Sequence, residues 1–230
     1  MKEMIKKVPF LNSFARRILW ITRKSNRSEA NSFPGTQAYW ENRYATGGNS
    51  GVGSYEKFAE FKAEVINRFV AEKEVESVIE FGCGDGNQLK LAEYPAYLGL
   101  DVSETALSLC KQLFLQDDKK AFKRMKEYAG EKADLALSLD VIFHLVEDDV
   151  FENYLFTLYQ AANRFVIIYS SDADGDNLQG GMHVKHRKFT SWVRENIPGW
   201  NLIEQIPNKY PYKGDYTTGS FANFFIYERA

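Results

Sequence analysis

The residues with the clearest chemical meaning lie at positions 78–87 (VIEFGCGDGN), where an apolar strand runs into a glycine loop. A second apolar stretch, residues 97–101, follows and ends on the carboxylate of Asp101. Glycines let a backbone approach a ligand closely because they carry no Cβ. Asp101 can accept hydrogen bonds from the hydroxyls of a ribose. A strand, a glycine turn, a helix and a strand that ends in an acid form half of a doubly wound nucleotide site, so the sequence predicts an adenosine-containing cofactor.

The spacing of the glycines indicates which adenosine cofactor this is. Gly82, Gly84 and Gly86 are spaced two and two, whereas the dinucleotide fingerprint is Gly-x-Gly-x-x-Gly. Glu80 precedes the loop and Asp85 lies inside it. Two carboxylates would oppose a pyrophosphate, but they suit a cationic ligand such as the sulfonium and ammonium groups of S-adenosylmethionine. The chain has no Gly-Lys-Ser/Thr phosphate loop, which argues against nucleoside triphosphate chemistry.

At these positions the chain resembles the class I S-adenosylmethionine-dependent methyltransferases, over roughly residues 37–230. Residues 80–86 match their first motif, and Asp101 matches the ribose-binding acid of their second strand. The resemblance implies an α/β fold, with a doubly wound, mostly parallel seven-stranded sheet and an antiparallel last strand. It also implies S-adenosylmethionine as cofactor and S-adenosylhomocysteine as product. The predicted cofactor-binding residues are Tyr39, Trp40, Arg43, Glu80, Gly82, Cys83, Gly84, Gly86, Asn87, Asp101, Val102 and Asp140.

Hydrophobic patterning predicts the elements that position these residues. Helices are expected over 37–44, 58–73 and 104–115, with another opening at 88–92, and strands over 77–81, 97–101, 134–140, 164–170, 202–206 and 221–228. A short third strand is expected within 121–128, with Glu127 as a candidate for the acid that contacts adenine in this family. The glycine-rich segment 45–54, together with the helix before it, resembles the part that covers the cofactor in many small methyltransferases.

Histidines near the predicted strand ends are the candidate catalytic residues. His144 follows the fourth strand and is expected at the edge of the sheet where ligands bind. His183 and His186 lie in the segment 180–188, which follows the fifth strand. We predict catalytic roles for all three. The alternative for each is a structural histidine, because a lone histidine serves either role.

The acceptor is expected to be small, polar, and anionic or sugar-like. Lys185 and Arg187 alternate with His183 and would share one side of an extended segment, where an arginine can bind a carboxylate or phosphate through two hydrogen bonds. The alternative is a solvated basic loop. The predicted acceptor-binding residues are Tyr44, Lys185, Arg187, Lys209 and Tyr210. Metal binding is not expected, because two histidines three residues apart without a thiol are a weak ligand set.

Two short motifs suggest a narrower role. Residues 39–44 and 183–187 resemble segments of methyltransferases encoded in bacterial surface-polysaccharide clusters, some of which act in O-methyl phosphoramidate capsule modification. This resemblance implies methylation of an oxygen on a phosphorylated or glycan-related metabolite. An NAD-dependent oxidoreductase is the alternative enzyme, which the glycine spacing and the loop acids disfavour. A cofactor-binding protein without catalysis is a third interpretation, which His144 and the basic segment disfavour.

Composition sets the remaining expectations. The 230 residues carry a net charge of -2, which does not favour nucleic-acid binding by the whole surface. Two cysteines imply no disulfide framework, and no apolar run is long enough to span a bilayer, so a cytoplasmic location is expected. Residues 1–36 hold eight basic and two acidic residues, which predicts a basic amphipathic helical extension before a domain at 37–230. That extension either docks on the domain or makes a weak contact with a membrane surface or partner through residues 1–30.

Overall fold

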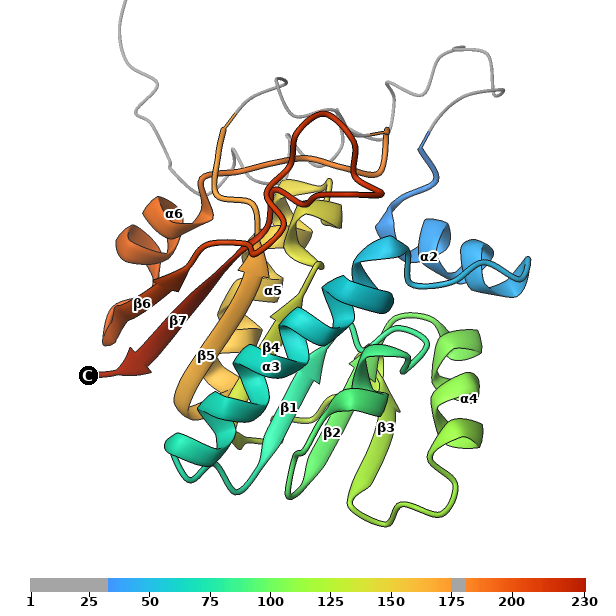
Figure 1. Cartoon of the computed structure of the whole chain (residues 1–230), viewed down its shortest axis with the longest axis horizontal. Helices are drawn as coiled ribbons and strands as arrows, with labels where there is room; N and C mark the ends of the chain where they lie inside the picture. The colour runs from blue at the N-terminus through green and yellow to red at the C-terminus, as the bar shows by residue number, and fades with distance from the viewer. Residues whose placement is uncertain (1–32, 175–180) are drawn as a thin grey trace, which may run out of the picture. The chain divides into compact units, whose positions relative to one another are not determined.

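A single seven-stranded sheet forms the centre of the protein, in the strand order β3-β2-β1-β4-β5-β7-β6. The computed structural model describes residues 33–174 and 181–230 (Figure 1). The strands are β1 (Val78–Phe81), β2 (Tyr97–Asp101), β3 (Lys120–Arg124), β4 (Ala133–Leu139), β5 (Ala162–Ser170), β6 (Trp200–Ile206) and β7 (Asn223–Arg229). β7 lies antiparallel between β5 and β6, and the other pairs are parallel. The predicted mostly parallel sheet with an antiparallel last strand is therefore confirmed.

Helices cover both faces of this sheet. They are α2 (Thr36–Ala45), α3 (Glu56–Glu72), α4 (Glu104–Leu113), α5 (Asp148–Ala161) and α6 (Phe189–Asn196), with 3₁₀ turns η1 (Val52–Ser54), η2 (Gln88–Leu91), η3 (Met125–Glu127) and η4 (Ile142–His144). α3 and α4 pack on one face and α5 and α6 on the other, so the fold is doubly wound (Figure 1). Alternation along β4 serves both layers, since Leu135 and Leu137 join the α3 side whereas Ala136 joins the α5 side.

Local sequence signals explain the start of α4 and the buried face of α3. Ser103 caps α4, because its hydroxyl accepts a hydrogen bond from the amide of Ala106 at 3.1 Å. The apolar stripe of α3, which includes Phe61, Val65 and Phe69, is buried against the sheet as its spacing predicts. In the chain, α3 precedes β1 and α4 follows β2, so the two helices flank the first crossover of the nucleotide-site half.

The helix expected to open at residues 88–92 is the main departure from the predicted elements. The chain makes only the 3₁₀ turn η2 there. The side chain of Asn67 donates to the carbonyl oxygen of Leu91 at 2.8 Å and accepts from the amide of Glu93 at 3.1 Å. Pro95 follows two residues later and disfavours the helical conformation in the residue before it. The crossover from β1 to β2 is therefore short, and α3 covers this part of the sheet.

The predicted extension at residues 1–36, with its amphipathic helix, lies outside the described residues except for its last four. Thr36 already belongs to α2. Within the described part of the chain, no helix has both the length and the apolar character needed to cross a membrane.

The order of the strands places the functional edge. Consecutive connections run outward from β1 in one direction and from β4 in the other, so the crevice between these two strands is the topological switch point. The carboxyl ends of β1, β2 and β4 meet there, and α2 lies over them (Figure 1).

Candidate functional site

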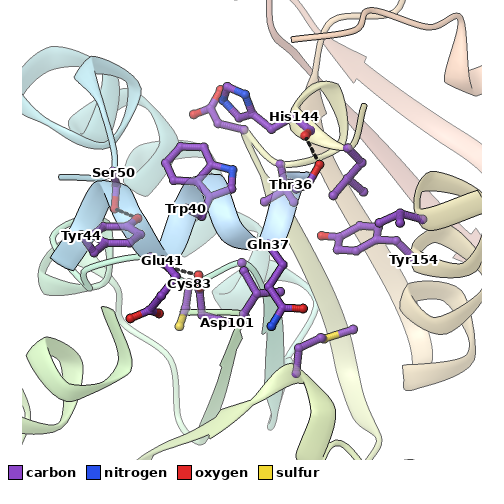
Figure 2. A pocket seen from close by; sticks show the side chains of 18 of the residues that line it. Thr36, Gln37, Trp40, Glu41, Tyr44, Ser50, Cys83, Asp101, His144 and Tyr154 are labelled. Carbon is purple, nitrogen blue, oxygen red and sulfur yellow. Dashed lines mark hydrogen bonds between the residues drawn. The ribbon is translucent and has the colours of Figure 1, made fainter. Parts of the chain in front are cut away.

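A cavity of about 820 Å³ lies at the switch point, within the size range of small-molecule sites. Its floor comes from the ends of β1, β2 and β4, its cover from α2 and the segment after it, and one wall from α5. Figure 2 shows Trp40 and Glu41 on α2 between His144 and Asp101, with Tyr154 entering from α5. The lining includes Gln37, Trp40, Glu41, Tyr44, Lys62, Glu80, Gly82, Cys83, Gly84, Asp101, Val102, Met125, Asp140, His144, Glu147 and Tyr154.

The glycine loop brings bare backbone to the cavity floor. Gly82 has φ +85°, and a Cβ there would lie 2.5 Å from a methyl carbon of Val141. Gly84 has φ +59°, and a Cβ there would lie 2.3 Å from the hydroxyl oxygen of Ser50. Side chains rarely adopt this conformation, so both positions require glycine on grounds of space and backbone geometry.

Asp101 ends β2 at the cavity and is buried. One carboxylate oxygen accepts from the amide of Gly84 at 2.9 Å and the other from the amide of Ser103 at 2.8 Å. Burial raises the pKa of Asp101 to about 6, although these amides oppose the shift. Each oxygen keeps a further lone pair, so this fixed carboxylate can still accept hydrogen bonds from a ligand.

Glu80 is a second buried acid in the cavity wall. The hydroxyl of Tyr97 donates to its carboxylate at 2.7 Å. Burial raises the pKa of Glu80 to about 7, opposed by the Tyr97 hydrogen bond and by the charge of Lys62. A group with that pKa changes charge near neutral pH and responds strongly to a cation bound beside it.

The lining is strongly acidic. Among the described residues that line the cavity there are five carboxylates and one cation, Lys62. Lys62 lies on α3, is buried, and its Nζ is 2.7 Å from a carboxylate oxygen of Asp140. Lys62 was not among the residues predicted to line the site. A lysine within the apolar stripe of α3 was the signal that could have identified it, because lysine is rarely buried without a partner. The excess of negative charge fits a ligand that carries positive charge.

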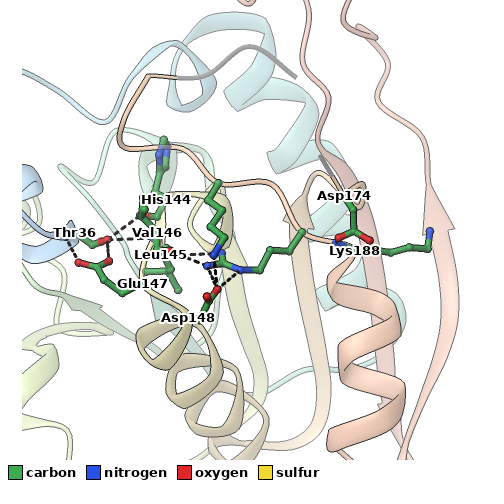
Figure 3. A network of polar contacts seen from close by, with 10 residues as sticks. Thr36, His144, Leu145, Val146, Glu147, Asp148, Asp174 and Lys188 are labelled. Atoms are coloured by element: carbon green, nitrogen blue, oxygen red, sulfur yellow. Dashed lines mark hydrogen bonds and ion pairs between the residues drawn. The ribbon is translucent and has the colours of Figure 1, made fainter. Parts of the chain in front are cut away.

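Two carboxylates hold α2 over the cavity. Glu147 lies at the N-terminus of α2, where it accepts from the amide of Thr36 at 3.0 Å and contacts its hydroxyl at 2.6 Å (Figure 3). Glu41 on α2 lies at the N-terminus of α4, where it accepts from the amide of Glu104 at 2.8 Å and the hydroxyl of Thr105 at 2.7 Å. Helix N-termini favour anions, so each carboxylate stabilises one attachment of the cover.

Three residues of the loop that were predicted to face the ligand contact other parts of the protein instead. Asp85 accepts from the amide of Ser50 at 2.9 Å and from the hydroxyl of Tyr55 at 2.8 Å. The side-chain Nδ2 of Asn87 donates to the carbonyl oxygen of Ser54 at 2.8 Å, and a Cβ on Gly86 would meet the sulfur of Cys110 on α4. None of Asp85, Gly86 and Asn87 lines the cavity. Asp85 was expected to favour a cationic ligand directly, but one of its carboxylate oxygens accepts from the covering segment and the other from the backbone amide of Asn87 at 3.1 Å.

His144 is the one predicted catalytic histidine that lines the cavity. Its Nδ1 is 3.0 Å from the carbonyl oxygen of His183. A carbonyl oxygen only accepts, so Nδ1 carries the proton and Nε2 is left as an acceptor. Burial lowers the pKa of His144 to about 3, so the imidazole is neutral at pH 7. Trp40 packs against its ring edge to face at a centroid distance of 4.9 Å.

The other two histidines lie outside the lining. The ring of His183 stacks between Tyr39, at a centroid distance of 4.6 Å, and His144, at 5.3 Å. Neither His183 nor Tyr39 lines the cavity, so the two rings pack against His144 on the side away from it. His186 is buried elsewhere, with Nδ1 2.6 Å from the hydroxyl of Ser171.

The predicted acceptor-binding cations are occupied by other contacts. The carboxylate of Asp148 accepts hydrogen bonds from Lys185 Nζ at 2.6 Å and from Arg187 Nη2 at 2.8 Å. Arg187 also donates to the carbonyl oxygens of Leu145 and Val146, which Figure 3 labels beside Asp148. Lys185 and Arg187 anchor the segment after β5 to the start of α5 and do not line the cavity.

Four further predicted residues also lie outside the lining. Lys209 pairs with Glu64 at 3.2 Å, and Tyr210 packs on Phe58 and Phe61. Arg43 donates to the carbonyl oxygen of Asn49 at 2.6 Å. Glu127 is exposed and caps η3, whereas its neighbour Met125 reaches the cavity.

The structure therefore gathers ten of the predicted residues into one lining: Trp40, Tyr44, Glu80, Gly82, Cys83, Gly84, Asp101, Val102, Asp140 and His144. In the described ranges 33–174 and 181–230, no group of three or more His, Cys, Asp or Glu side chains is arranged to hold a metal ion.

We expect the imidazole of His144 to stay neutral, with its proton on Nδ1, between about pH 5 and pH 8, because burial disfavours the charged form. Long-range ¹⁵N–¹H NMR spectra of the imidazoles measure both the tautomer and the titration. The His144→Gln variant identifies the signal by its loss. A midpoint between pH 6 and 7 for that signal would contradict the prediction.

We also expect Glu147→Gln to loosen the cover, because the variant removes the charge at the N-terminus of α2. The loss should be about 1 kcal/mol of local stability and should appear as faster amide hydrogen exchange in residues 36–45. Hydrogen-exchange mass spectrometry measures this directly. Glu152→Gln, at an exposed position on α5, is the matched control and should leave exchange unchanged. Equal protection of α2 in both variants would mean that Glu147 does not hold it.

Known proteins resemble this chain in one segment of sequence and in the fold. Residues 79–159 match the family model of a methyltransferase domain. No curated protein sequence matches the chain. The N-methyltransferase NodS from Bradyrhizobium japonicum WM9, solved with S-adenosylhomocysteine, is 14% identical at a TM-score of 0.65, over 85% of this chain and 98% of that one.

Two more solved structures share the fold. Magnesium protoporphyrin IX methyltransferase from Synechocystis PCC 6803, solved with bound S-adenosylmethionine, is 13% identical at a TM-score of 0.61, over 87% of this chain and 100% of that one. The methyltransferase domain of a bacterial Hen1 is 18% identical at a TM-score of 0.56, over 73% and 96% of the two chains. The segment from β1 into α5 is therefore similar to a methyltransferase domain, and the whole fold is one found in S-adenosylmethionine-dependent methyltransferases.

Proposed function

We propose that this protein transfers a methyl group from S-adenosylmethionine to an oxygen of a small polar acceptor. The observation that carries the proposal is the cavity at the switch point, where a glycine loop, the buried Asp101 and an excess of carboxylates meet under α2. Its acidic lining suits a cationic cofactor, whereas a pyrophosphate would be repelled by it.

The residues of the floor fit the parts of this cofactor. Asp101 would accept hydrogen bonds from the ribose hydroxyls, and Val102 and Met125 offer apolar surface for the adenine ring. Glu80 and Asp140 would face the cationic methionine portion. When bound, the cofactor supplies a methyl group on a sulfonium, a carbon already activated for in-line displacement.

The remaining residues of the cavity would orient the acceptor. His144 is neutral and presents Nε2 as an acceptor, so it can receive a hydrogen bond from an acceptor hydroxyl. Its low pKa makes it a weak base, so we assign it to orientation and leave proton removal to follow the transfer. Trp40 and the rest of α2 would exclude water, and His183 would hold the His144 ring through its carbonyl oxygen.

The contacts of the basic segment favour an uncharged acceptor over an anionic one. Lys185 and Arg187 are neutralised by Asp148, and the described lining holds five carboxylates against one cation, so an anionic acceptor would be repelled. A hydroxyl-bearing, glycan-related metabolite fits these facts better than a phosphorylated one. The role in bacterial surface-polysaccharide biosynthesis rests on the two sequence motifs, and nucleic acid is not the acceptor that we propose.

The first test is calorimetric binding of S-adenosylhomocysteine to the wild-type chain and to Asp101→Ala. The variant should bind at least about tenfold more weakly, because it loses hydrogen bonds to a charged acceptor worth ~1.5–3 kcal/mol. Asp118→Ala, at an exposed loop position, is the matched control and should bind like the wild type. Thermal denaturation of both variants shows whether they are folded.

NAD and NADH serve as competitors in the same experiment. Displacement of S-adenosylhomocysteine by NAD, or an affinity unchanged by Asp101→Ala, would refute the proposed cofactor site.

The affinity for S-adenosylmethionine should rise with pH between about pH 6 and pH 8. Glu80 in the free protein has a pKa raised to about 7, and a cationic ligand favours its ionised form, so binding releases a proton. Asp101, with a pKa of about 6, adds the same dependence at lower pH. Calorimetry in two buffers of different protonation enthalpy measures the proton release.

Glu80→Gln should reduce this pH dependence, and Glu60→Gln, at an exposed position on α3, should leave it intact. Proton uptake on binding, or an affinity independent of pH, would contradict the assignment of Glu80 to the cationic portion of the cofactor.

A further inference from the structure

Lys62 is a buried cation at the edge of the candidate site. It lies on α3 within the helix's apolar stripe, and 1% of its side chain is exposed. Burying an ammonium group costs several kcal/mol, which only a close partner offsets. Lys62 nevertheless lines the cavity, as the one cation found among its described lining residues. A lysine that occupies such a position either joins α3 to the sheet or takes part in ligand binding.

The partner of Lys62 is more open than the lysine itself. Asp140 follows β4 in a left-handed conformation, φ +58°, and its amide donates to the carbonyl oxygen of Tyr169 at 2.9 Å. Its side chain is 19% exposed and also lines the cavity. The Lys62 Nζ lies 2.7 Å from this carboxylate and 5.3 Å from the ring of Tyr169. One end of the cavity therefore presents a positive and a negative group side by side.

We propose that the Lys62–Asp140 pair binds the amino-acid end of the cofactor, with Lys62 facing its carboxylate and Asp140 facing its ammonium group. The inference rests on the proposed function and deepens it. A zwitterionic ligand end is complementary to a zwitterionic protein pair, and each contact is a charge-assisted hydrogen bond. Arg43, the cation that was predicted to bind the cofactor, does not line the cavity, and its Nε donates to the carbonyl oxygen of Asn49.

Geometry separates this role from a purely structural one. An ion pair that only joined α3 to the end of β4 would not need to line the cavity, as both Lys62 and Asp140 do. If the pair were purely structural, replacing both partners with neutral groups would leave the preference between ligands unchanged. Glu80 points to the same face of β1 as Val78, toward α3. Burial raises the pKa of Glu80, and the charge of Lys62 opposes that rise, so the cation acts on the cavity wall as well as on Asp140.

The test compares two ligands on the whole chain by calorimetry. S-adenosylhomocysteine carries the amino-acid end, whereas 5′-methylthioadenosine keeps the adenosine and the thioether but lacks that end. The wild type should prefer S-adenosylhomocysteine, and Lys62→Met should reduce the preference at least about tenfold, the scale of one charge-assisted hydrogen bond. Its affinity for 5′-methylthioadenosine should change less than about threefold.

Matched variants control for charge and folding. Arg68→Met removes a cation from an exposed position of the same helix and should keep the wild-type preference. Asp140→Asn should reduce the preference as Lys62→Met does. The double variant Lys62→Met/Asp140→Asn leaves neither charge buried alone, so it keeps the test decisive if a single variant fails to fold.

The outcomes separate the two proposals. If the wild type binds neither ligand, the proposed function fails, and this inference fails with it. If the wild type binds S-adenosylhomocysteine and the folded variants keep its full preference over 5′-methylthioadenosine, the proposed function stands and the Lys62–Asp140 assignment is overturned. Loss of the preference in both the Lys62 variants and Asp140→Asn, with 5′-methylthioadenosine binding retained, supports the assignment.

Discussion

Negative charge held in a buried cavity is the constraint on which this structure depends. Each carboxylate at the switch point would be costly to bury alone, and each has a specific partner. Asp101 accepts from two backbone amides, Glu80 from the hydroxyl of Tyr97, and Asp140 pairs with Lys62. These partners leave the acids inside the protein with hydrogen-bonding capacity to spare. A ligand that brings positive charge would then bind into an environment already organised for it.

The cover over this cavity is built with the same chemistry. α2 has few apolar contacts of its own compared with α3, so polar attachments decide where it lies. Glu147 binds its first turn and Glu41 binds the first turn of α4, so carboxylates at helix N-termini fix the cover at both sides. Asp85 fixes the segment that follows. Most of these hydrogen bonds are only partly buried, so the cover is attached through polar contacts at its edges, whereas α3 is attached through the packed core.

In the basic segment after β5, the cations predicted to bind the acceptor form ion pairs within the protein instead. Lys185 and Arg187 meet Asp148 at the start of α5, where they hold the chain that carries His183. The carbonyl oxygen of His183 in turn fixes the tautomer of His144. The two cations therefore influence the cavity indirectly, by positioning the chain that orients His144, and do not line it themselves.

The sequence by itself determined the fold class, the glycine loop, the acids at the ends of β1 and β2, and the Ser103 cap, because turn geometry, helix capping and alternating burial are local properties of the chain. The tertiary structure alone decided which charges face the cavity. Lys62 lies far in sequence from Asp140, Arg187 and Asp148 are 39 residues apart, and Glu147 and Thr36 are 111 apart. Whether a charged side chain binds a ligand or a neighbour depends on the segments that folding brings together, and no local pattern contains that information.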